Sequence, residues 1–212
     1  MEKEKIPEFI ERMTAAYPDA KCGLNFASAY GLLISTVLSA QCTDKRVNEV
    51  TAKLFSRAES PSEMLSLGYE KLAEIIRPCG LYQTKAKHII ALSQILDSEY
   101  GGEVPGTKQE LLRLPGVGVK TANVVLSNAF GIPAIAVDTH VFRVANRLGL
   151  AKAATPEKTE LQLNEALPIK SWSDMHHRLI WHGRQICHAR KPLCDACPVR
   201  DMCDYFKGEG RL

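Results

Sequence analysis

The chain has 212 residues, of which 45% are hydrophobic and 7% aromatic, a composition typical of a globular protein with one large domain or two small ones. Its 27 Lys and Arg residues against 24 Asp and Glu give a formal charge of +3, which permits an anionic partner without requiring one. The sequence lacks both a membrane span of about 18 apolar residues and a secretory signal, so we expect a cytoplasmic protein with no membrane partner.

The apolar residues recur with helical spacing along nearly the whole chain, and no segment indicates a strand. Ala and Leu are frequent while aromatic residues are few, which favours helices over sheets. We therefore predict an all-α fold. The expected helices span residues 4–16, 26–40, 44–56, 61–66, 69–76, 81–99, 107–113, 118–130, 139–148, 155–166 and 171–188.

Local signals mark several of these helix boundaries. Oxygen-bearing N-cap residues, two of them followed by proline, are expected at Thr43, Ser60 and Thr155. Glycines are expected to end or interrupt helices at Gly131, Gly149 and Gly183. The apolar residues of 141–148 are spaced by three and four, which predicts one buried stripe on a helix that Gly149 ends.

Residues 107–130 indicate a helix, a tight turn and a second helix. Pro115 cannot continue the first helix, and Gly116 and Gly118 allow backbone angles that other residues avoid. The turn Gly116-Val117-Gly118 is therefore predicted to present backbone amides to an anion such as a DNA phosphate. A Gly-x-Gly turn by itself more often only connects two helices.

Lys120 is an unusual residue for the first turn of a helix. The helix dipole disfavours a cation there by a few tenths to about 1 kcal/mol. The same field favours a neutral amine, the form that attacks carbon, so Lys120 is a candidate nucleophile. A lysine that binds a phosphate would explain the position equally well, and the pattern does not separate these two interpretations.

Asp138 ends the apolar run IPAIAV and directly precedes the helix at 139–148. Asp is a preferred N-cap, worth about 1 kcal/mol, and the spacing alone favours that role. Amide donors at a helix start also stabilise an ionised carboxylate, so a cap can hold a charged catalytic group as well. His140, two residues on, is expected to be a structural hydrogen-bonding residue.

Four cysteines crowd into CHARKPLCDACPVRDMC, with the spacing Cys-x6-Cys-x2-Cys-x5-Cys. They are Cys187, Cys194, Cys197 and Cys203. In a reducing compartment such a cluster indicates a metal site, and both zinc and a [4Fe-4S] cluster accept four thiolates. A single Cys-x2-Cys pair favours iron and sulfur, while His182 and His188 keep zinc as an alternative.

The remaining cysteines and the basic residues near the cluster carry weaker signals. Cys22, Cys42 and Cys79 are expected to be small buried hydrophobic residues without chemistry. Near the four-cysteine segment, the candidate phosphate contacts are Arg184, Arg190, Lys191 and Arg200. A solvated surface balanced by Asp195, Asp201 and Asp204 is the alternative.

Three motifs together identify a family. LPGVGVKTANVV, AVDTHVFRVANRLGL and the cysteine spacing closely resemble the endonuclease III family of helix-hairpin-helix DNA glycosylases, and the similarity runs from LISTVLSAQCTD to Cys203. The resemblance implies a bifunctional base-excision repair enzyme that removes oxidised pyrimidines from duplex DNA and cleaves abasic sites. It implies that Lys120 attacks C1′ and forms a Schiff base, after which β-elimination cuts the strand 3′ to the lesion.

The resemblance also assigns roles to other residues. Asp138 matches the catalytic carboxylate, and the four cysteines match the ligands of a [4Fe-4S] cluster. In LSAQCTDK and CGLYQTKAK it implies that Gln41 fills the gap left by the extruded base and that Leu81 wedges the opposite strand. Without it, Gln41 would be an ordinary solvent-facing residue and Leu81 a core residue. Val119 stands where relatives commonly carry Arg or Lys, which removes one phosphate-facing charge.

The family layout predicts two lobes with a DNA groove between them. We expect a six-helix domain at residues 23–132 that contains the hairpin, and a discontinuous [4Fe-4S] cluster domain formed by 1–22 and 133–212. The expected partner is duplex DNA with damaged bases or abasic sites, bound by a monomer associated with the nucleoid of a prokaryote. The alternatives are a glycosylase specialised for pyrimidine dimers or mismatched thymine, and a non-catalytic DNA-binding module with a structural metal site.

Overall fold

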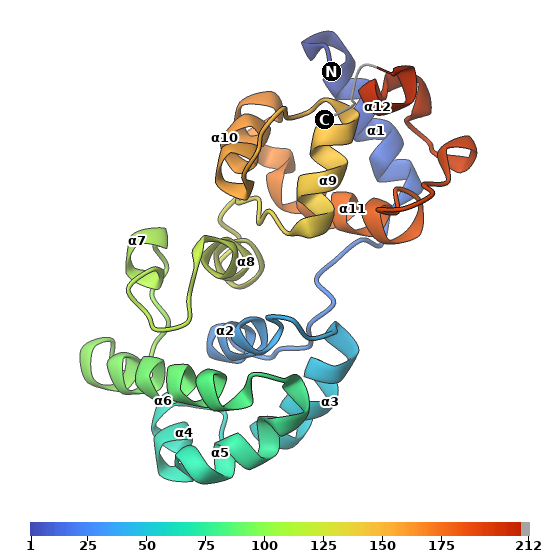
Figure 1. Cartoon of the computed structure of the whole chain (residues 1–212). Coiled ribbons are helices and arrows are strands. Elements are labelled where there is room, and N and C mark those ends of the chain that lie inside the picture. Colours follow the sequence, from blue (N-terminus) through green and yellow to red (C-terminus); the bar gives the residue numbers. More distant parts are fainter. Residues whose placement is uncertain (209–212) are drawn as a thin grey trace. The chain divides into compact units, whose positions relative to one another are not determined.

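The protein is a helical chain, described by a computed structural model over residues 1–208 (Figure 1). Its α-helices are α1 (Ile6–Ala16), α2 (Ala29–Leu38), α3 (Asp44–Phe55), α4 (Pro61–Leu67), α5 (Tyr69–Ile76), α6 (Tyr82–Glu99), α7 (Lys108–Leu111), α8 (Val119–Ala129), α9 (Thr139–Leu148), α10 (Pro156–Ala166), α11 (Trp172–Gln185) and α12 (Asp204–Lys207). Short 3-10 helices lie at Lys3–Lys5, Arg77–Cys79, Ile169–Ser171, Cys194–Ala196 and Arg200–Met202. Residues 1–208 contain no β-strand, which confirms the all-α prediction.

The predicted helix caps are present at the positions where they were expected. The side chains of Thr43, Ser60 and Thr155 each accept a hydrogen bond from a backbone amide in the first turn of α3, α4 and α10. Gly149 ends α9 in a left-handed conformation, with φ of 78°. The helix predicted at 171–188 instead ends at Gln185.

Gly183 was expected to punctuate a helix, and that expectation is wrong, because it lies within α11. A Cβ atom added at Gly183 would lie 3.0 Å from Cβ of His140 and 3.2 Å from Nη2 of Arg143, both on α9. A larger residue here would require His140 and Arg143 to shift by a few tenths of an ångström, so glycine suits the close approach of α9 and α11.

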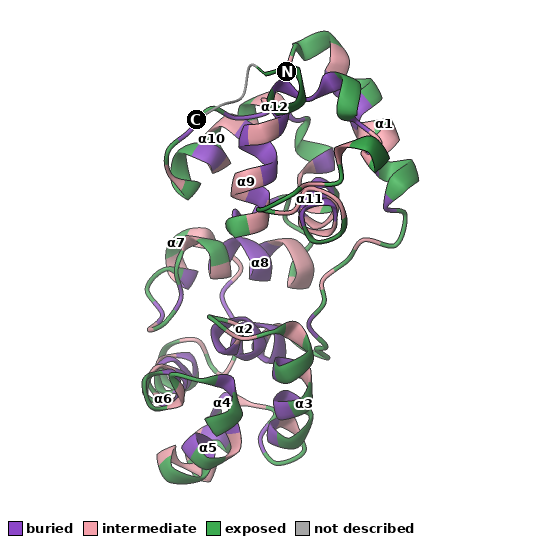
Figure 2. Cartoon of the chain, turned by 45° about the vertical axis from the view of Figure 1, so that its right-hand side comes forward, coloured by how far each residue is buried: buried purple, intermediate pink, exposed green. Residues whose placement is uncertain are grey.

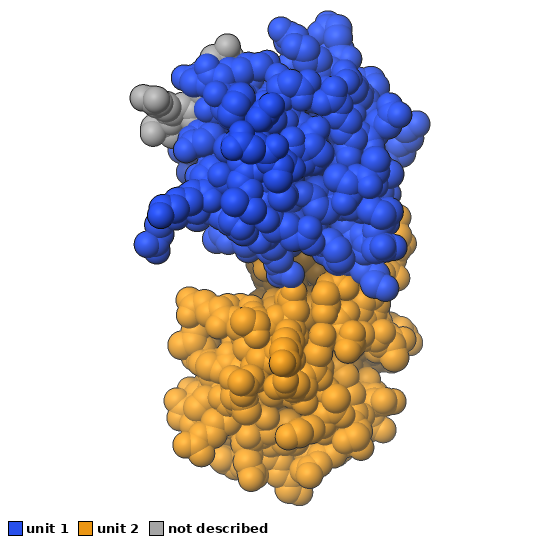
Figure 3. Space-filling model, turned by 90° about the vertical axis from the view of Figure 1, so that its right-hand side faces the viewer, with its two compact units in different colours: residues 1–21, 133–212 blue, residues 22–132 orange. Residues whose placement is uncertain are grey.

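The described chain divides into two compact units, which Figure 3 colours separately. Cys22–Ile132 forms one unit and contains α2 to α8. Its central element is α2, whose residues from Tyr30 to Leu38 are all buried, as the colouring of Figure 2 shows. A helix that is apolar on all sides has to be covered on all sides, so α2 forms the core on which its neighbours pack.

The other unit joins the start of the chain to its second half, because Met1–Lys21 packs with the described residues from Pro133 onward. The buried side chains of α1, Ile6, Phe9 and Met13, are spaced by three and four and belong to one hydrophobic core with the predicted stripe of α9. Every residue of that stripe is at most 1% exposed, which confirms it.

The assignment of the two units as a hairpin domain and a cluster domain stays a prediction. The predicted bounds were 23–132 for the first domain and 1–22 with 133–212 for the second, of which residues 209–212 lie outside the described part of the chain. Along residues 1–208, none of the helices combines the length and the apolar character needed to cross a bilayer.

Candidate active site and metal centre

The predicted hairpin consists of α7, a turn at 112–118 and α8. Gly116 has φ of 79°, and a Cβ atom added there would lie 2.9 Å from both Cβ and Nδ1 of His88 on α6. The fold itself therefore requires glycine at 116. Val117 is buried and its amide donates to the carbonyl of Leu114 at 3.1 Å, so neither its side chain nor its amide is available to a ligand.

Gly118 differs from Gly116 in that nothing in the fold requires it. Its φ of −97° and ψ of 179° suit any residue, and an added Cβ atom would meet no atom within 4 Å. Gly118 is the N-cap of α8 and supplies no side-chain cap. Within residues 1–208, the amides from Gly118 to Thr121 consequently have no acceptor, which leaves a cluster of N–H groups open to an anion.

Lys120 lies in this first turn of α8. Its side chain is exposed and makes no ion pair or hydrogen bond with the described residues. No ion pair with a carboxylate of residues 1–208 therefore accompanies this ammonium near the helix start. Val119 directly precedes it and is half-buried.

Asp138 belongs to the other unit, where it caps α9 as the spacing predicted. Its Oδ1 atom accepts hydrogen bonds from the amides of His140 and Val141, both at 2.8 Å. The other carboxylate oxygen, Oδ2, has no partner in the described part of the chain. The cap therefore fixes one oxygen and leaves the second available to a ligand. His140 meets Nη2 of Arg143 at 3.2 Å through Nδ1, in agreement with a structural role.

The predicted inserting residues share an unusual backbone conformation. Gln41 has φ of 54°, Leu81 has φ of 46°, and within residues 1–208 the only other non-glycine residue with positive φ is Lys191, at 53°. Gln41 and Lys191 are exposed, and Leu81 is 61% exposed, so Leu81 is not a core residue. Left-handed backbone is strained for these residue types and is concentrated at functional sites.

The four clustered cysteines line one pocket in the second half of the chain. Burial, together with the nearby Cys203 and Cys187, raises the pKa of the Cys197 thiol to about 11. Four thiolates in this space therefore need a bound cation, and the donor set fits a soft metal centre. Within residues 1–208, no three His, Cys, Asp or Glu side chains are arranged as ligands of one metal ion.

His182, the candidate for a zinc ligand, is buried at the edge of this pocket. Its Nδ1 atom lies 2.8 Å from the hydroxyl of Tyr17, and its Nε2 atom lies 3.8 Å from Sγ of Cys197. Burial lowers the pKa of His182 to about 4, so the imidazole is neutral at physiological pH. His182 thus bridges α1 and the cysteine segment.

Two arginines that the sequence analysis missed tie the cysteine segment to α9. Arg147 donates to the carbonyls of His188 at 2.6 Å and Ala189 at 2.9 Å, and its Nη1 lies 3.5 Å from Sγ of Cys187. Arg143 donates to the carbonyl of Cys187 at 3.1 Å. Their spacing of four residues places them on one face of α9, and this is the signal that could have identified them.

The four predicted phosphate contacts near the cysteines are all exposed: Arg184, Arg190, Lys191 and Arg200. Arg190 and Lys191 form no ion pair within the described residues, whereas Arg200 pairs with Asp195 at 3.0 Å. The balanced surface charge considered for this region thus applies to Arg200 but not to Arg190 and Lys191.

The other three cysteines do not form a further metal site. Cys79 is buried as expected, whereas Cys22 and Cys42 are only half-buried. Burial, together with the neighbouring Cys42 thiol, raises the pKa of Cys79 to about 12.

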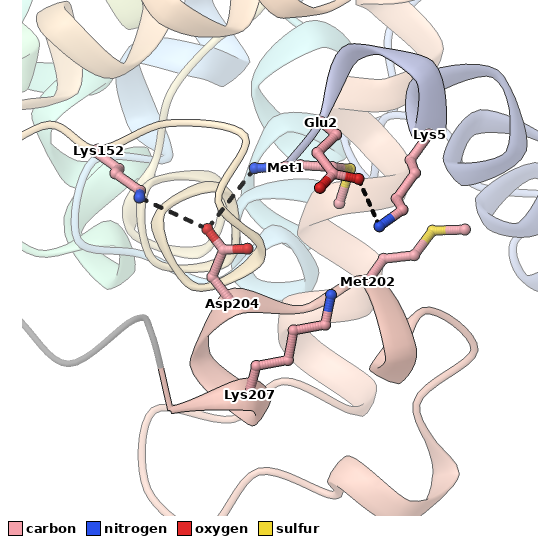
Figure 4. A pocket seen from close by; sticks show the side chains of 7 residues that line it. All are labelled: Met1, Glu2, Lys5, Lys152, Met202, Asp204 and Lys207. Atoms are coloured by element: carbon pink, nitrogen blue, oxygen red, sulfur yellow. Dashed lines mark ion pairs between the residues drawn. The ribbon is translucent and has the colours of Figure 1, made fainter.

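A second cavity, of about 320 Å³, lies beside the end of the cysteine segment (Figure 4). The ammonium group of Met1 donates to the carbonyl of Gly149 at 2.6 Å and lies 3.7 Å from Oδ2 of Asp204, which is also 4.0 Å from Nζ of Lys152. These contacts fasten the N-terminal segment to the end of α9 and to α12. The charged groups are thus engaged in structural pairs.

Comparison with known families identifies both regions. Residues 34–168 match the HhH-GPD superfamily base excision DNA repair protein, and residues 187–203 match the iron-sulfur binding domain of endonuclease III. The second match covers all four clustered cysteines and supports a [4Fe-4S] cluster as the cofactor, in agreement with the prediction.

Individual relatives agree over nearly the whole chain. Endonuclease III of Rickettsia conorii is 48% identical over 97% of this chain and 98% of its own length, and that of Escherichia coli K12 is 47% identical over 97% of each. Among solved structures, a trapped endonuclease III–DNA covalent intermediate has a TM-score of 0.92 at 44% identity and covers 100% of both chains. A thermostable thymine-DNA glycosylase has a TM-score of 0.86 at 25% identity, over 97% of this chain and 98% of its own. The chain therefore belongs to the endonuclease III family within the HhH-GPD superfamily of base excision DNA repair proteins.

Proposed function

We propose that this base excision repair DNA glycosylase and lyase acts on oxidised pyrimidines in duplex DNA, with Lys120 as its nucleophile and Asp138 as its catalytic carboxylate. The observation that carries the proposal is the setting of Lys120 in the structure. Lys120 is exposed, forms no ion pair or hydrogen bond within residues 1–208 and adjoins the open amides of Gly118 to Thr121. A phosphate bound at those amides would hold the sugar of the lesion near Nζ of Lys120.

The chemistry follows from a neutral Lys120 amine. Nζ attacks C1′, the glycosidic bond breaks, and the base leaves with the electron pair and takes up a proton. The sugar ring opens to an imine between Nζ and C1′, which makes the C2′ proton acidic. Removal of that proton expels the 3′ phosphate, and water then hydrolyses the imine and frees Lys120.

Asp138 is proposed to stabilise the positive charge that develops on the sugar. Its Oδ1 atom is held by two amides, which fixes the position of the carboxylate, while Oδ2 remains available. The same chain carries both Lys120 and Asp138. Since one chain supplies both groups, we infer that a monomer is sufficient.

DNA binding is assigned to the exposed groups outside these two residues. Gln41 and Leu81 would enter the helix when the base is extruded, and their strained, exposed positions support this role. Gly118, Arg184, Arg190 and Lys191 would contact phosphates, whereas Gly116 and Val117 would shape the turn. The four cysteines would hold the cluster, which, when bound, supplies metal–thiolate links that fold the segment carrying Arg190 and Lys191.

The proposed substrate class is supported by the relatives that this chain resembles most strongly in sequence. The endonuclease III relatives are 43–48% identical, whereas the thymine-DNA glycosylase is 25% identical, so mismatched thymine is the less supported alternative. The presence of Lys120 also favours combined base removal and strand cleavage over base removal alone.

The proposal is tested by single-turnover cleavage of matched duplexes that contain thymine glycol, dihydrouracil, a G·T mismatch, a pyrimidine dimer or an abasic site. We expect rapid cleavage at the first two and at the abasic site, and little at the others. Preferential cleavage at the mismatch or the dimer would contradict the substrate class. Strand cleavage that survives in Lys120→Gln would contradict the role of Lys120.

A further inference from the structure

Lys85 is a buried cation on the first turn of α6 that the proposed reaction does not use. It is 4% exposed, and its Nζ atom donates to the carbonyls of Leu38, Ala40 and Cys79, each at 2.8 Å. An ammonium group has three N–H donors, so these bonds satisfy all of them. Within residues 1–208, Lys85 has no carboxylate partner.

Such a position is expensive for a folded protein. A buried charge without an opposite charge costs several kcal/mol unless hydrogen bonds replace its hydration. Burial also lowers the pKa of Lys85, while the nearby Cys79 and Cys42 thiols act in the opposite direction. A methionine of similar size would avoid the buried charge but would leave the carbonyls of Leu38, Ala40 and Cys79 without this donor, so the ammonium group is kept for the three bonds it makes.

The three acceptors lie on two separate segments, which are the segments that carry the proposed inserting residues. Leu38 and Ala40 lie where α2 ends, directly before Gln41, and Cys79 lies two residues before Leu81. The thiols of Cys42 and Cys79, which belong to the same two segments, are near enough to each other to interact electrostatically. Lys85 therefore connects the backbones of two turns that are some 40 residues apart in sequence.

We propose that Lys85 is a positioning residue that holds the turn of Gln41 and the turn of Leu81 at a fixed separation, so that both side chains enter the duplex together. This inference rests on the proposed function, because it requires Gln41 and Leu81 to be the inserting residues. Both turns are held in strained left-handed conformations, with φ of 54° at Gln41 and 46° at Leu81, and such conformations persist only where surrounding contacts fix them.

A purely structural explanation makes a different prediction. A lysine near the C-terminal carbonyls of α2 also satisfies orphan acceptors and complements the helix dipole. If that were its whole role, its loss would lower stability without any specific effect on base extrusion. The two explanations therefore separate when substrates that need extrusion are compared with one that does not.

The experiment compares Lys85→Met with the double variant Gln41→Ala/Leu81→Ala and with the triple variant, all as cluster-containing full-length protein. Lys53→Met, which removes an exposed lysine from α3, is the matched control. Single-turnover cleavage is measured at paired thymine glycol and at an abasic site, which has no base to extrude. The fluorescence of 2-aminopurine opposite the lesion reports insertion directly.

We expect Lys85→Met to lose at least about tenfold in cleavage at thymine glycol, to change by less than about threefold at the abasic site, and to lose the 2-aminopurine signal. Because all three residues act as one device, the triple variant should be little worse than the double variant. If Lys85→Met is not folded by its melting curve and cluster absorbance, Lys85→Gln, which keeps a donor but is too short to join both turns, replaces it.

The positioning role would be overturned if Lys85→Met lowered the cleavage rates at thymine glycol and at the abasic site equally. It would also be overturned if the decrease in rate of the triple variant equalled the product of the decreases of Lys85→Met and of the double variant. If the double variant cleaves thymine glycol at the wild-type rate, the inserting roles in the proposed function fail, and this inference fails with them. If the double variant is impaired and Lys85→Met is not, only the role of Lys85 is wrong.

Discussion

The two glycines of the hairpin turn should respond to alanine in opposite ways. Gly116→Ala places a Cβ atom at φ of 79° and 2.9 Å from His88, so it should destabilise the fold. Left-handed backbone costs a non-glycine residue about 1–2 kcal/mol. For a chain of this size that corresponds to a drop in Tm of about 2–8 °C, before the contact with His88 is relieved.

Gly118→Ala should leave the fold intact, because φ is −97° and no atom lies within 4 Å of the added Cβ atom. Replacing glycine at a compatible position stabilises by about 0.4–1 kcal/mol through the unfolded state, which offsets the preference for glycine over alanine at the N-cap of α8. Its effect should fall on DNA. If the methyl group keeps a phosphate from the open amides, one or two charged hydrogen bonds worth about 1.5–3 kcal/mol are lost, a decrease in affinity of about 10- to 150-fold.

The assay combines thermal unfolding of each variant with binding to an abasic-site duplex at fixed salt, since phosphate contacts depend strongly on salt. Wild-type affinity in Gly118→Ala would refute the phosphate site at this turn. A loss of stability in Gly118→Ala as large as in Gly116→Ala would refute the distinction drawn between the two glycines.

Three further predictions concern the other parts of the site. Asp138→Asn should keep the cap of α9, because Asn is an equally good N-cap, yet slow base removal by about 10²–10³-fold. Asp138→Ala should also lose about 1 kcal/mol of stability. Denaturation and single-turnover kinetics check both results, and rapid base removal by Asp138→Asn would contradict a role for the carboxylate. Leu81→Gly should leave stability unchanged or raise it by up to about 1 kcal/mol, because glycine relieves the strain at φ of 46°. The same variant should be impaired in the extrusion of a paired lesion. A large decrease in Tm would show instead that Leu81 packs in the core. Cys197→Ser should abolish the visible absorbance of the cluster and lower both Tm and DNA affinity, since metal binding contributes folding free energy. A colourless variant that binds DNA with wild-type affinity would contradict the link between the cluster and the nearby cations.

The sequence alone was sufficient for features that depend on neighbouring residues in the chain. The caps at Thr43, Ser60 and Thr155 and the end of α9 at Gly149 are set within one or two turns, and all of them were predicted. The small α12 was not predicted, because four residues are too few for a periodic pattern. Long periodic helices therefore emerge from the sequence more readily than short ones.

Features that depend on distant contacts required the structure. Gly183 resembles a helix stop, and only its proximity to His140 explains why it lies inside α11. Lys85 is one of three lysines in the stretch 85–108, and nothing in the sequence marks it as the buried one. For Leu81, composition favoured the core, and the family resemblance rather than the residue pattern indicated an exposed position.

The central claim is that Lys120 forms a covalent intermediate with the sugar of a damaged nucleotide. Borohydride reduces such an imine to a stable amine, so trapping on a thymine glycol duplex and on an abasic duplex tests it directly, with Lys120→Gln as the control. We expect both duplexes to trap the wild-type protein, and peptide mapping to place the adduct at Lys120, while the variant gives no adduct but keeps DNA affinity. Absence of an adduct with wild-type protein, or an undiminished adduct in Lys120→Gln, would contradict the account.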